Sequence, residues 1–205
     1  MPISKQTLYT AILAACCLQP LTAGPLSQGE REHLVAHLQM TATWLSDEVS
    51  PLSEEQLNFR SAPGRWTIAE VVQHLVIAEP NYWKLLREGV NHPPQTLKQK
   101  ATDADVLWYG IDRTRHEKTP AKQDPQGEKI NIADALASYG KLHATMLDYA
   151  AKTEDDLRGH AVPEWGVDAY QCLLEISTHE QRHILQIREI KADPGFPKAK
   201  AVASH

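Results

Sequence analysis

Apolar residues and two histidines share one stripe near the carboxyl end of the chain. The stripe consists of Cys172, Ile176, His179, His183, Ile187 and Ile190. Its spacings of four, three, four, four and three residues are those of an α-helix that buries one face. The pattern predicts a helix that begins after Gly166 and ends near Lys191, with both imidazoles facing the core. Two imidazoles four residues apart on one helix face are spaced to bind one metal ion.

Similar patterns predict three further long helices and no strand of useful length. The first spans about 28–48, and a short helix follows from Ser53. The second long helix starts after Thr67, where Glu70 completes a capping box, and the third spans about 131–157. An all-α fold is therefore expected, most simply a four-helix bundle.

A long connection, residues 91–129, separates the second and third long helices. It is polar and carries prolines, with one short helix expected to open at Thr102. A connection of this length in a compact domain is either functional or partly disordered. Its aromatic pair, Trp108 and Tyr109, could form a lid over a pocket, but we assign no site residue to the connection.

A catalytic metal site of the zinc type needs a third protein ligand and an open position. His74 lies on the apolar stripe of the second long helix, with Val71 and Ala78. His143 lies close to the inward face of the third long helix and is the alternative third or fourth ligand. Imidazoles buried in an apolar layer each need a partner, and one shared metal ion would serve all of them.

Residues 179–183 read HEQRH, which is also the HExxH signature of zinc peptidases. Gln186 and Glu189 occupy the positions where one peptidase class has a glycine and a further histidine, and the tail after His183 offers no second helix. No sheet is expected upstream, so we do not predict a peptidase. Glu180 then stays a weak catalytic candidate, and a solvated surface charge is the preferred interpretation.

Length, composition and net charge indicate the number of domains and the class of partner. With 205 residues, 42% of them hydrophobic, the chain is expected to form one domain. A net charge of −5 does not favour nucleic-acid binding.

The amino terminus has the features of an export signal over residues 1–24. Lys5 precedes an apolar run from Leu8 to Leu18 that is too short to span a bilayer. Either cleavage follows Ala23, or Cys16 becomes the lipid-modified first residue, since residues 13–16 resemble a lipoprotein cleavage box. We therefore expect an exported protein of the bacterial periplasm or cell envelope, with a helical domain over 25–192 and a flexible tail over 193–205.

Two blocks of the sequence carry a family resemblance. Residues 66–75, WTIAEVVQHL, and residues 179–187, HEQRHILQI, resemble the signature blocks of the DinB/YfiT-like superfamily. The resemblance implies an up-down-down-up four-helix bundle, often dimeric, and no DNA binding. It also implies that three histidines bind one divalent ion such as zinc or nickel. By position, these are His74, His179 and His183.

The family resemblance implies either a hydrolase or a thiol S-transferase, and a non-catalytic metal-binding or ligand-binding bundle is a further alternative. A divalent ion held by neutral imidazoles activates water or a thiol. Low-molecular-weight thiols are chiefly cytosolic, so for an exported protein we prefer hydrolysis of a small-molecule substrate. Glu70 and Glu175, each four residues before a predicted ligand, are candidates to orient the imidazoles.

Overall fold

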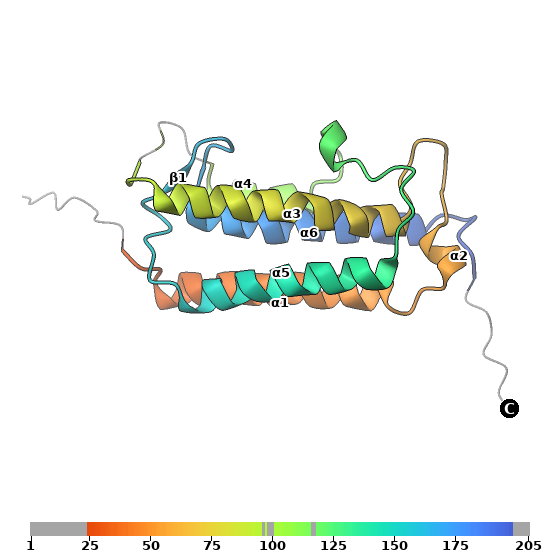
Figure 1. Ribbon diagram of the computed structural model, residues 1–205, viewed down its shortest axis with the longest axis horizontal. Helices are drawn as coiled ribbons and strands as arrows, with labels where there is room; N and C mark the ends of the chain where they lie inside the picture. The colour runs from red at the N-terminus through yellow and green to blue at the C-terminus, as the bar shows by residue number, and fades with distance from the viewer. Residues whose placement is uncertain (1–23, 96, 98–100, 116–117, 199–205) are drawn as a thin grey trace, which may run out of the picture.

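Four long helices run side by side in two layers (Figure 1). The computed structural model describes residues 24–95, 97, 101–115 and 118–198. One layer holds α1 (Gln28–Val49) and α5 (Ile132–Lys152), and the other holds α3 (Ile68–Asn91) and α6 (Ala169–Lys191). The chain runs in one direction along α1 and α6 and in the other along α3 and α5. The predicted all-α bundle with up-down-down-up topology is confirmed.

Side-chain caps set the start of the helices where the sequence places them. Thr67 accepts a hydrogen bond from the backbone N–H of Glu70 at 3.1 Å, and the Glu70 carboxylate accepts one from the N–H of Thr67 at 2.8 Å. The same reciprocal pair opens α2 (Glu54–Leu57) at Ser53 and α4 (Asp103–Ile111) at Thr102. Each pair satisfies two of the N–H groups that a helix start leaves without partners.

The end of α5 differs from the prediction. The helix stops at Lys152, five residues before Leu157, because the backbone of Thr153 is extended, with φ of −61° and ψ of 137°. A short hairpin follows, in which β1 (Ala161–Val162) pairs antiparallel with β2 (Val167–Asp168). Gly166 supplies the left-handed backbone of its turn, with φ of 68°. Strands of two residues are too short to leave an alternating pattern in the sequence.

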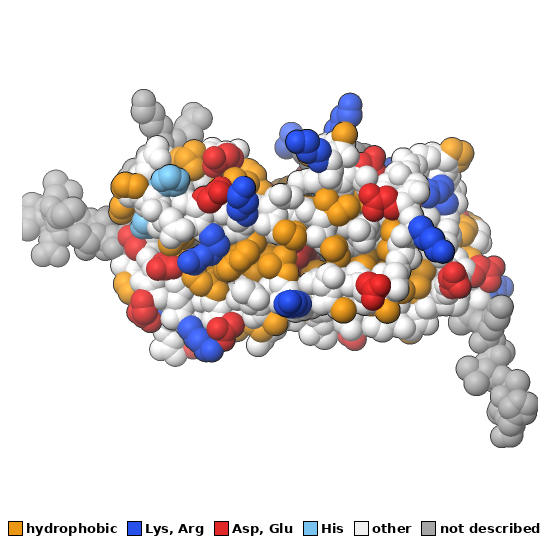
Figure 2. All heavy atoms as spheres, in the orientation of Figure 1, with side chains coloured by type: hydrophobic (Ala, Val, Ile, Leu, Met, Phe, Trp, Pro, Cys, Tyr) orange, Lys and Arg blue, Asp and Glu red, His pale blue; other side chains and the backbone are white. Residues whose placement is uncertain are grey.

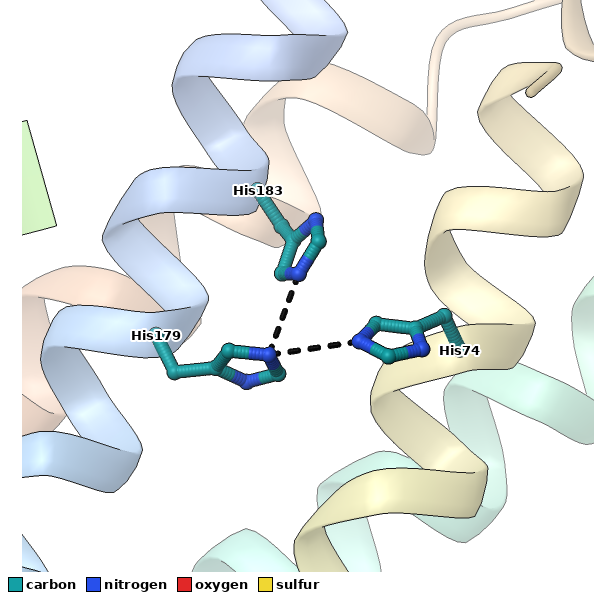
Figure 3. A group of neighbouring side chains, drawn as sticks. All are labelled: His74, His179 and His183. Atoms are coloured by element: carbon teal, nitrogen blue, oxygen red, sulfur yellow. Dashed lines mark hydrogen bonds between the residues drawn. The ribbon is translucent and has the colours of Figure 1, made fainter. Parts of the chain in front are cut away.

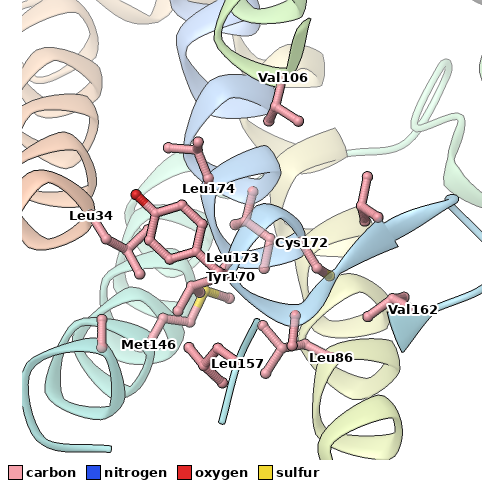
Figure 4. Close-up of a cluster of buried hydrophobic side chains, with 14 of the residues drawn as sticks. Leu34, Leu86, Val106, Met146, Leu157, Val162, Tyr170, Cys172, Leu173 and Leu174 are labelled. Atoms are coloured by element: carbon pink, nitrogen blue, oxygen red, sulfur yellow. The ribbon is translucent and has the colours of Figure 1, made fainter. Parts of the chain in front are cut away.

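Two buried apolar clusters occupy the two ends of the bundle. One lies beside the hairpin and includes Leu34, Leu86, Met146, Leu157 and Leu173 (Figure 4). The other lies toward α2 and includes Leu45, Val49, Ile68, Leu75 and Ile187. On α6 the clusters are separated by residues 177–183, most of which are polar. Buried polar side chains on α1, α3 and α5 (Thr41, Glu79 and His143) occupy the same interval. The bundle therefore has a polar middle between two apolar ends.

The first part of the predicted tail is packed against α2. The rings of Phe59 and Phe196 meet edge to face at 5.5 Å between centroids, and the Gln56 side chain donates to the carbonyl of Pro197 at 2.9 Å. Residues 199–205 lie outside the described residues, as do residues 1–23 with the predicted export signal and Cys16. Among the helices that are described, none is both long and apolar enough to cross a membrane.

Candidate metal centre

Three buried imidazoles converge at one point between α3 and α6 (Figure 3). The Nε2 atom of His179 lies 3.2 Å from Nε2 of His74 and 3.1 Å from Nε2 of His183. His74 comes from the second turn of α3, and the other two come from successive turns of α6. The structure thus brings together the three histidines that the sequence places on the inward stripes.

Hydrogen bonds on the far side of two rings fix where their protons lie. Nδ1 of His74 is 2.8 Å from the carbonyl oxygen of Gln123, and Nδ1 of His183 is 2.8 Å from Oε1 of Gln186. These oxygens accept hydrogen bonds, so each Nδ1 carries the proton and each Nε2 presents a lone pair. A single N–H on His179 Nε2 could satisfy only one of the two facing lone pairs. A cation at the centre would satisfy all three.

The environment keeps the three imidazoles neutral. Burial lowers the pKa of His74 and outweighs the hydrogen bond to Gln123. Burial, together with the neighbouring imidazoles, lowers the pKa of His179 well below its usual value. For His183, burial and the proximity of His74 lower the pKa to about 3. Metal ligation requires neutral imidazoles, so the site is in the ligating form without any change of pH.

The geometry fits a divalent ion. Ligand nitrogens about 2.0–2.1 Å from a tetrahedral ion are about 3.3 Å apart, close to the Nε2 separations of 3.1 and 3.2 Å. Three neutral nitrogen donors are the ligand set of open, catalytic zinc-type sites. Among the described residues, this is the group whose ligand atoms gather within 4.8 Å.

A cavity of about 400 Å³ opens over the histidines. Its walls include Trp66, Tyr82 and Tyr109. The Trp66 ring lies 4.9 Å from the His74 ring, and the Tyr82 ring lies 5.2 Å from that of His179. The indole N–H of Trp66 donates to Asp124 at 3.1 Å, which ties the wall to the long connection near η1 (Ala121–Gln123).

Of the two aromatic residues in the connection between α3 and α5, one lies at the cavity and one does not. Tyr109, on α4, lines the cavity, whereas Trp108 is 63% exposed and faces away from the protein. The buried guanidinium of Arg182 holds α4 on α6 by donating to the carbonyls of Tyr109, Asp112 and Arg115. α4 also approaches α6 closely at Gly110, where a Cβ atom would lie 2.9 Å from Cβ of Thr178.

Glu180 is not the surface charge that the sequence indicates. It is fully buried, accepts hydrogen bonds from Thr41 and from Nδ1 of His143 (3.1 Å), and does not line the cavity. His143, the alternative third or fourth ligand, is therefore paired with Glu180 and lies outside the histidine cluster. The expectation failed because α6 packs against α1, α3 and α4, so that 16 of its 23 residues are buried.

Glu70 and Glu175, the two carboxylates expected to orient the imidazoles, do not contact them through hydrogen bonds. Glu70 accepts hydrogen bonds from Arg60 and from the N–H groups of Thr67 and Gly127. Burial raises the pKa of Glu175 to about 7, and neither carboxylate hydrogen-bonds an imidazole. The acceptors are instead Gln123 and Gln186. Gln186 could have been found, because it follows His183 by three residues on the helix. Gln123 could not, since it lies 49 residues from His74 in a loop.

Two proteins that are similar to this chain in structure or in sequence are described as probable or putative metal-dependent hydrolases. The structure superposes on YfiT from Bacillus subtilis with a TM-score of 0.57 at 16% identity, covering 84% of this chain and 91% of that one. YfiT is described as "a probable metal-dependent hydrolase with an unusual four-helix bundle topology". A Geobacillus kaustophilus protein named "Putative metal-dependent hydrolase GK0616" is 36% identical over 70 residues, 34% of this chain and 39% of the relative. YuaE of Bacillus subtilis, an uncharacterized protein, is 26% identical over 152 residues, 73% of this chain and 90% of YuaE.

The fold and the site together define a four-helix-bundle protein with a three-histidine cluster beneath an open cavity. The sequence profile of the DinB superfamily matches residues 33–187. The chain belongs to the DinB superfamily, and the family resemblance carried by its two sequence blocks is confirmed.

Proposed function

We propose that the protein is a divalent-metal-dependent hydrolase of a small-molecule substrate, with His74, His179 and His183 as the metal ligands. The convergence of three Nε2 atoms at the floor of the cavity carries the proposal. The names given to two of its relatives support it. A cavity of about 400 Å³ is the size of a small-molecule site and is too small for a folded partner.

The residues of the chain prepare the site for this chemistry. When bound, a zinc, nickel or similar ion supplies Lewis-acid activation of water and polarises the bond to be cleaved. Gln123 and Gln186 hold the rings of His74 and His183 so that Nε2 faces the centre. Trp66 and Tyr82 form parts of the cavity wall, against the rings of His74 and His179. Burial raises the pKa of Tyr82, so its phenol stays protonated and can donate a hydrogen bond at the cavity wall.

Metal content measures the ligand assignment directly. We expect about one divalent ion per purified wild-type chain, and loss of that ion in His74→Ala, His179→Ala and His183→Ala. His143→Ala is the matched control, because His143 is also a buried helix histidine but lies outside the cluster. Unchanged metal content in all three variants would show that the proposal is wrong. Loss of metal in His143→Ala but not in His74→Ala would mean that His143, and not His74, is the third ligand.

Activity assays separate the proposed hydrolysis from the alternatives. The metal-loaded chain is assayed on a panel of aryl esters, amides and phosphoesters, with and without a low-molecular-weight thiol. Hydrolysis that requires the metal but no thiol supports the proposal. Turnover that needs the thiol indicates an S-transferase, and metal binding without turnover indicates a binding module.

We also propose, from the sequence alone, that the protein is exported to the cell envelope and forms a homodimer. The apolar run from Leu8 to Leu18 and the cleavage box before Cys16 support export. The family resemblance supports the dimer. Fractionation of cells that produce the full chain, followed by mass analysis of its amino terminus, distinguishes a lipid on Cys16 from cleavage after Ala23.

A further inference from the structure

Positive charge gathers around the cavity above the histidines. Of the described residues that line it, Arg65, Arg113, Lys118 and Arg182 are basic and Asp124 is acidic. The Asp124 carboxylate already accepts hydrogen bonds from the Trp66 indole and from the N–H of Gln126, both at 3.1 Å. The cavity therefore has an excess of positive charge before any metal ion is added.

Arg182 contributes a buried charge, and the hydrogen bonds of its guanidinium to the described residues go to backbone carbonyls. It is 5% exposed and, among the described residues, forms no ion pair. Its hydrogen-bond partners are backbone carbonyls of the α4 segment, and its guanidinium lies 5.0 Å from the centre of the Tyr109 ring. Carbonyl dipoles satisfy the N–H groups but leave the charge itself, which favours a nearby anion.

Arg113 presents an oriented guanidinium at the cavity wall. Its Nε and Nη2 atoms each donate to the Glu189 carboxylate at 2.9 Å, which fixes the plane of the group. Within the described part of the chain, Nη1 has no protein acceptor. A fixed guanidinium with free N–H groups is the usual partner of a carboxylate or phosphate.

We propose that the cavity selects small molecules that carry an oxyanion, a carboxylate or a phosphate, attached to a ring-bearing or apolar body. The oxyanion lies toward Arg113 and Arg182, and the body lies against Trp66 and Tyr82. The inference rests on the proposed function, since it names the substrate class of the same site. It assigns to Arg113 the preference of the site for a negatively charged substrate.

The exposed basic residues favour the approach of such a ligand. In Figure 2, Lys and Arg side chains gather on the raised segment that carries η1, above α3. Lys118, in the described part of this segment, is exposed and lines the cavity. Exposed charges of this kind raise the rate of encounter with an anion and contribute little to affinity, because salt screens them.

Binding of three matched probes tests the substrate class. Phenylacetate, phenylphosphonate and the neutral phenylacetamide are titrated into the full chain by calorimetry, with and without zinc. A zinc ion attracts carboxylates by itself, so the metal-free chain isolates the contribution of the arginines. We expect phenylacetate to bind the metal-free chain about 10-fold more tightly than phenylacetamide, as one charge-assisted hydrogen bond supplies. The phosphonate distinguishes a phosphate site from a carboxylate site.

Variants assign the preference to Arg113. Arg113→Gln should remove most of the difference between acid and amide, with the remainder due to Arg182. Arg113→Lys should keep a larger part of the difference, and Lys118→Gln should reduce it about 2-fold because its charge is screened. Lys141→Gln, an exposed lysine on α5 away from the cavity, is the control and should change nothing. If Arg113→Gln does not fold, Arg113→Lys and Lys118→Gln still give the comparison.

The outcomes separate this inference from the proposed function. Equal affinity for acid and amide in the wild-type chain overturns the inference, whether or not the chain holds metal. A preference for the acid that depends on Arg113, in a chain that binds no metal, keeps the anion site and removes the hydrolase.

Discussion

Two polar clusters lie on adjacent faces of α6, and both use residues of the five-residue stretch 179–183. The histidine cluster, His74, His179 and His183, faces the open cavity. The core cluster, Glu180 with His143, Thr41 and Glu79, lies inside the bundle. Burial lowers the pKa of His183 to about 3, whereas the Glu180 hydrogen bond overcomes burial and raises the pKa of His143. Equally buried histidines thus have pKa values that are lowered in one cluster and raised in the other.

The difference lies in where a negative charge is available. The Nδ1 atoms of His74 and His183 meet neutral oxygens, which set the tautomer without adding charge. Nδ1 of His143 meets the Glu180 carboxylate. Burial and the neighbouring Glu180 raise the pKa of Glu79 well above its usual value, which favours the protonated form of Glu79. The first cluster is therefore suited to bind a cation, whereas in the second the Glu180 carboxyl group favours the protonated form of His143.

Removal of Glu180 should have the largest effect and should be confined to the core cluster. Glu180→Ala leaves His143 without its counter-ion, and removing one partner of a buried pair costs about 3–5 kcal/mol. Urea unfolding measures the loss, and the folded fraction should keep its metal. Glu88→Ala, on the exposed i,i+4 pair with Lys84, is the control and should cost below about 0.5 kcal/mol.

Glu180→Gln distinguishes this structural role from a peptidase-type base. If Glu180 were the general base of an HExxH site, the isosteric amide would abolish activity and leave stability intact. We expect the opposite, a less stable chain whose activity per folded molecule is retained. An inactive but stable Glu180→Gln chain would contradict the separation of the two clusters.

Loss of Gln186 should weaken the histidine cluster and leave the core cluster intact. In Gln186→Leu the Nδ1 atom of His183 loses its acceptor, and partners of this kind are typically worth 10- to 100-fold in metal affinity. Competition with a chelator measures the affinity. Gln39→Leu, an exposed glutamine on α1, should bind metal as the wild type does. Equal metal affinity in the two variants would show that the Gln186 side chain does not orient His183.

A matched pair of glycine substitutions tests how α4 covers the cavity. In Gly110→Ala the new methyl group meets Thr178 at 2.9 Å, so α4 has to shift, at a cost of about 1–3 kcal/mol. Gly140, in α5, has nothing within 4 Å of a Cβ, and Gly140→Ala should stabilise the helix by up to about 1 kcal/mol. Thermal unfolding measures the change in stability that each substitution causes. Destabilisation by both substitutions would mean that the contact of Gly110 with Thr178 is not what matters.

The sequence predicts the scaffold and the inward histidines well, because both depend on local rules. The capping box at Thr67, the helix starts at Ser53 and Thr102 and the stripe on α6 depend on a few neighbouring residues, and all are present in the fold. The burial of Glu180 is decided by which helices surround α6. A period of 100° per residue identifies one buried face and does not reveal that a second face is covered as well.

The connection between α3 and α5 shows the same limit at longer range. Its short helix and its aromatic residues are visible in the sequence, but the carbonyl that orients His74 and the arginine that faces the cavity are not. Backbone carbonyls carry no residue type, so no pattern marks Gln123 as an acceptor. The pairing of Arg113 with Glu189 spans 76 residues and needs the folded chain to be seen.

The smallest expected effect is a pH dependence of opposite sign in the two clusters. The raised pKa of His143 means that its pairing stabilises the fold fully below about pH 6.5, the unfolded value, and that this stabilisation is lost as the pH rises through the folded pKa. The three histidines at the cavity have lowered pKa values, so acidification destabilises the metal-free chain through them.

The contribution of the three histidines is the same in the wild type and in His143→Gln, so it cancels in the difference between their stabilities. The stability difference between the two metal-free chains, followed by urea unfolding from about pH 5 to 9, should therefore be largest at the acid end and shrink as the pH rises. A difference that grows toward alkaline pH would mean that His143 is neutral beside Glu180.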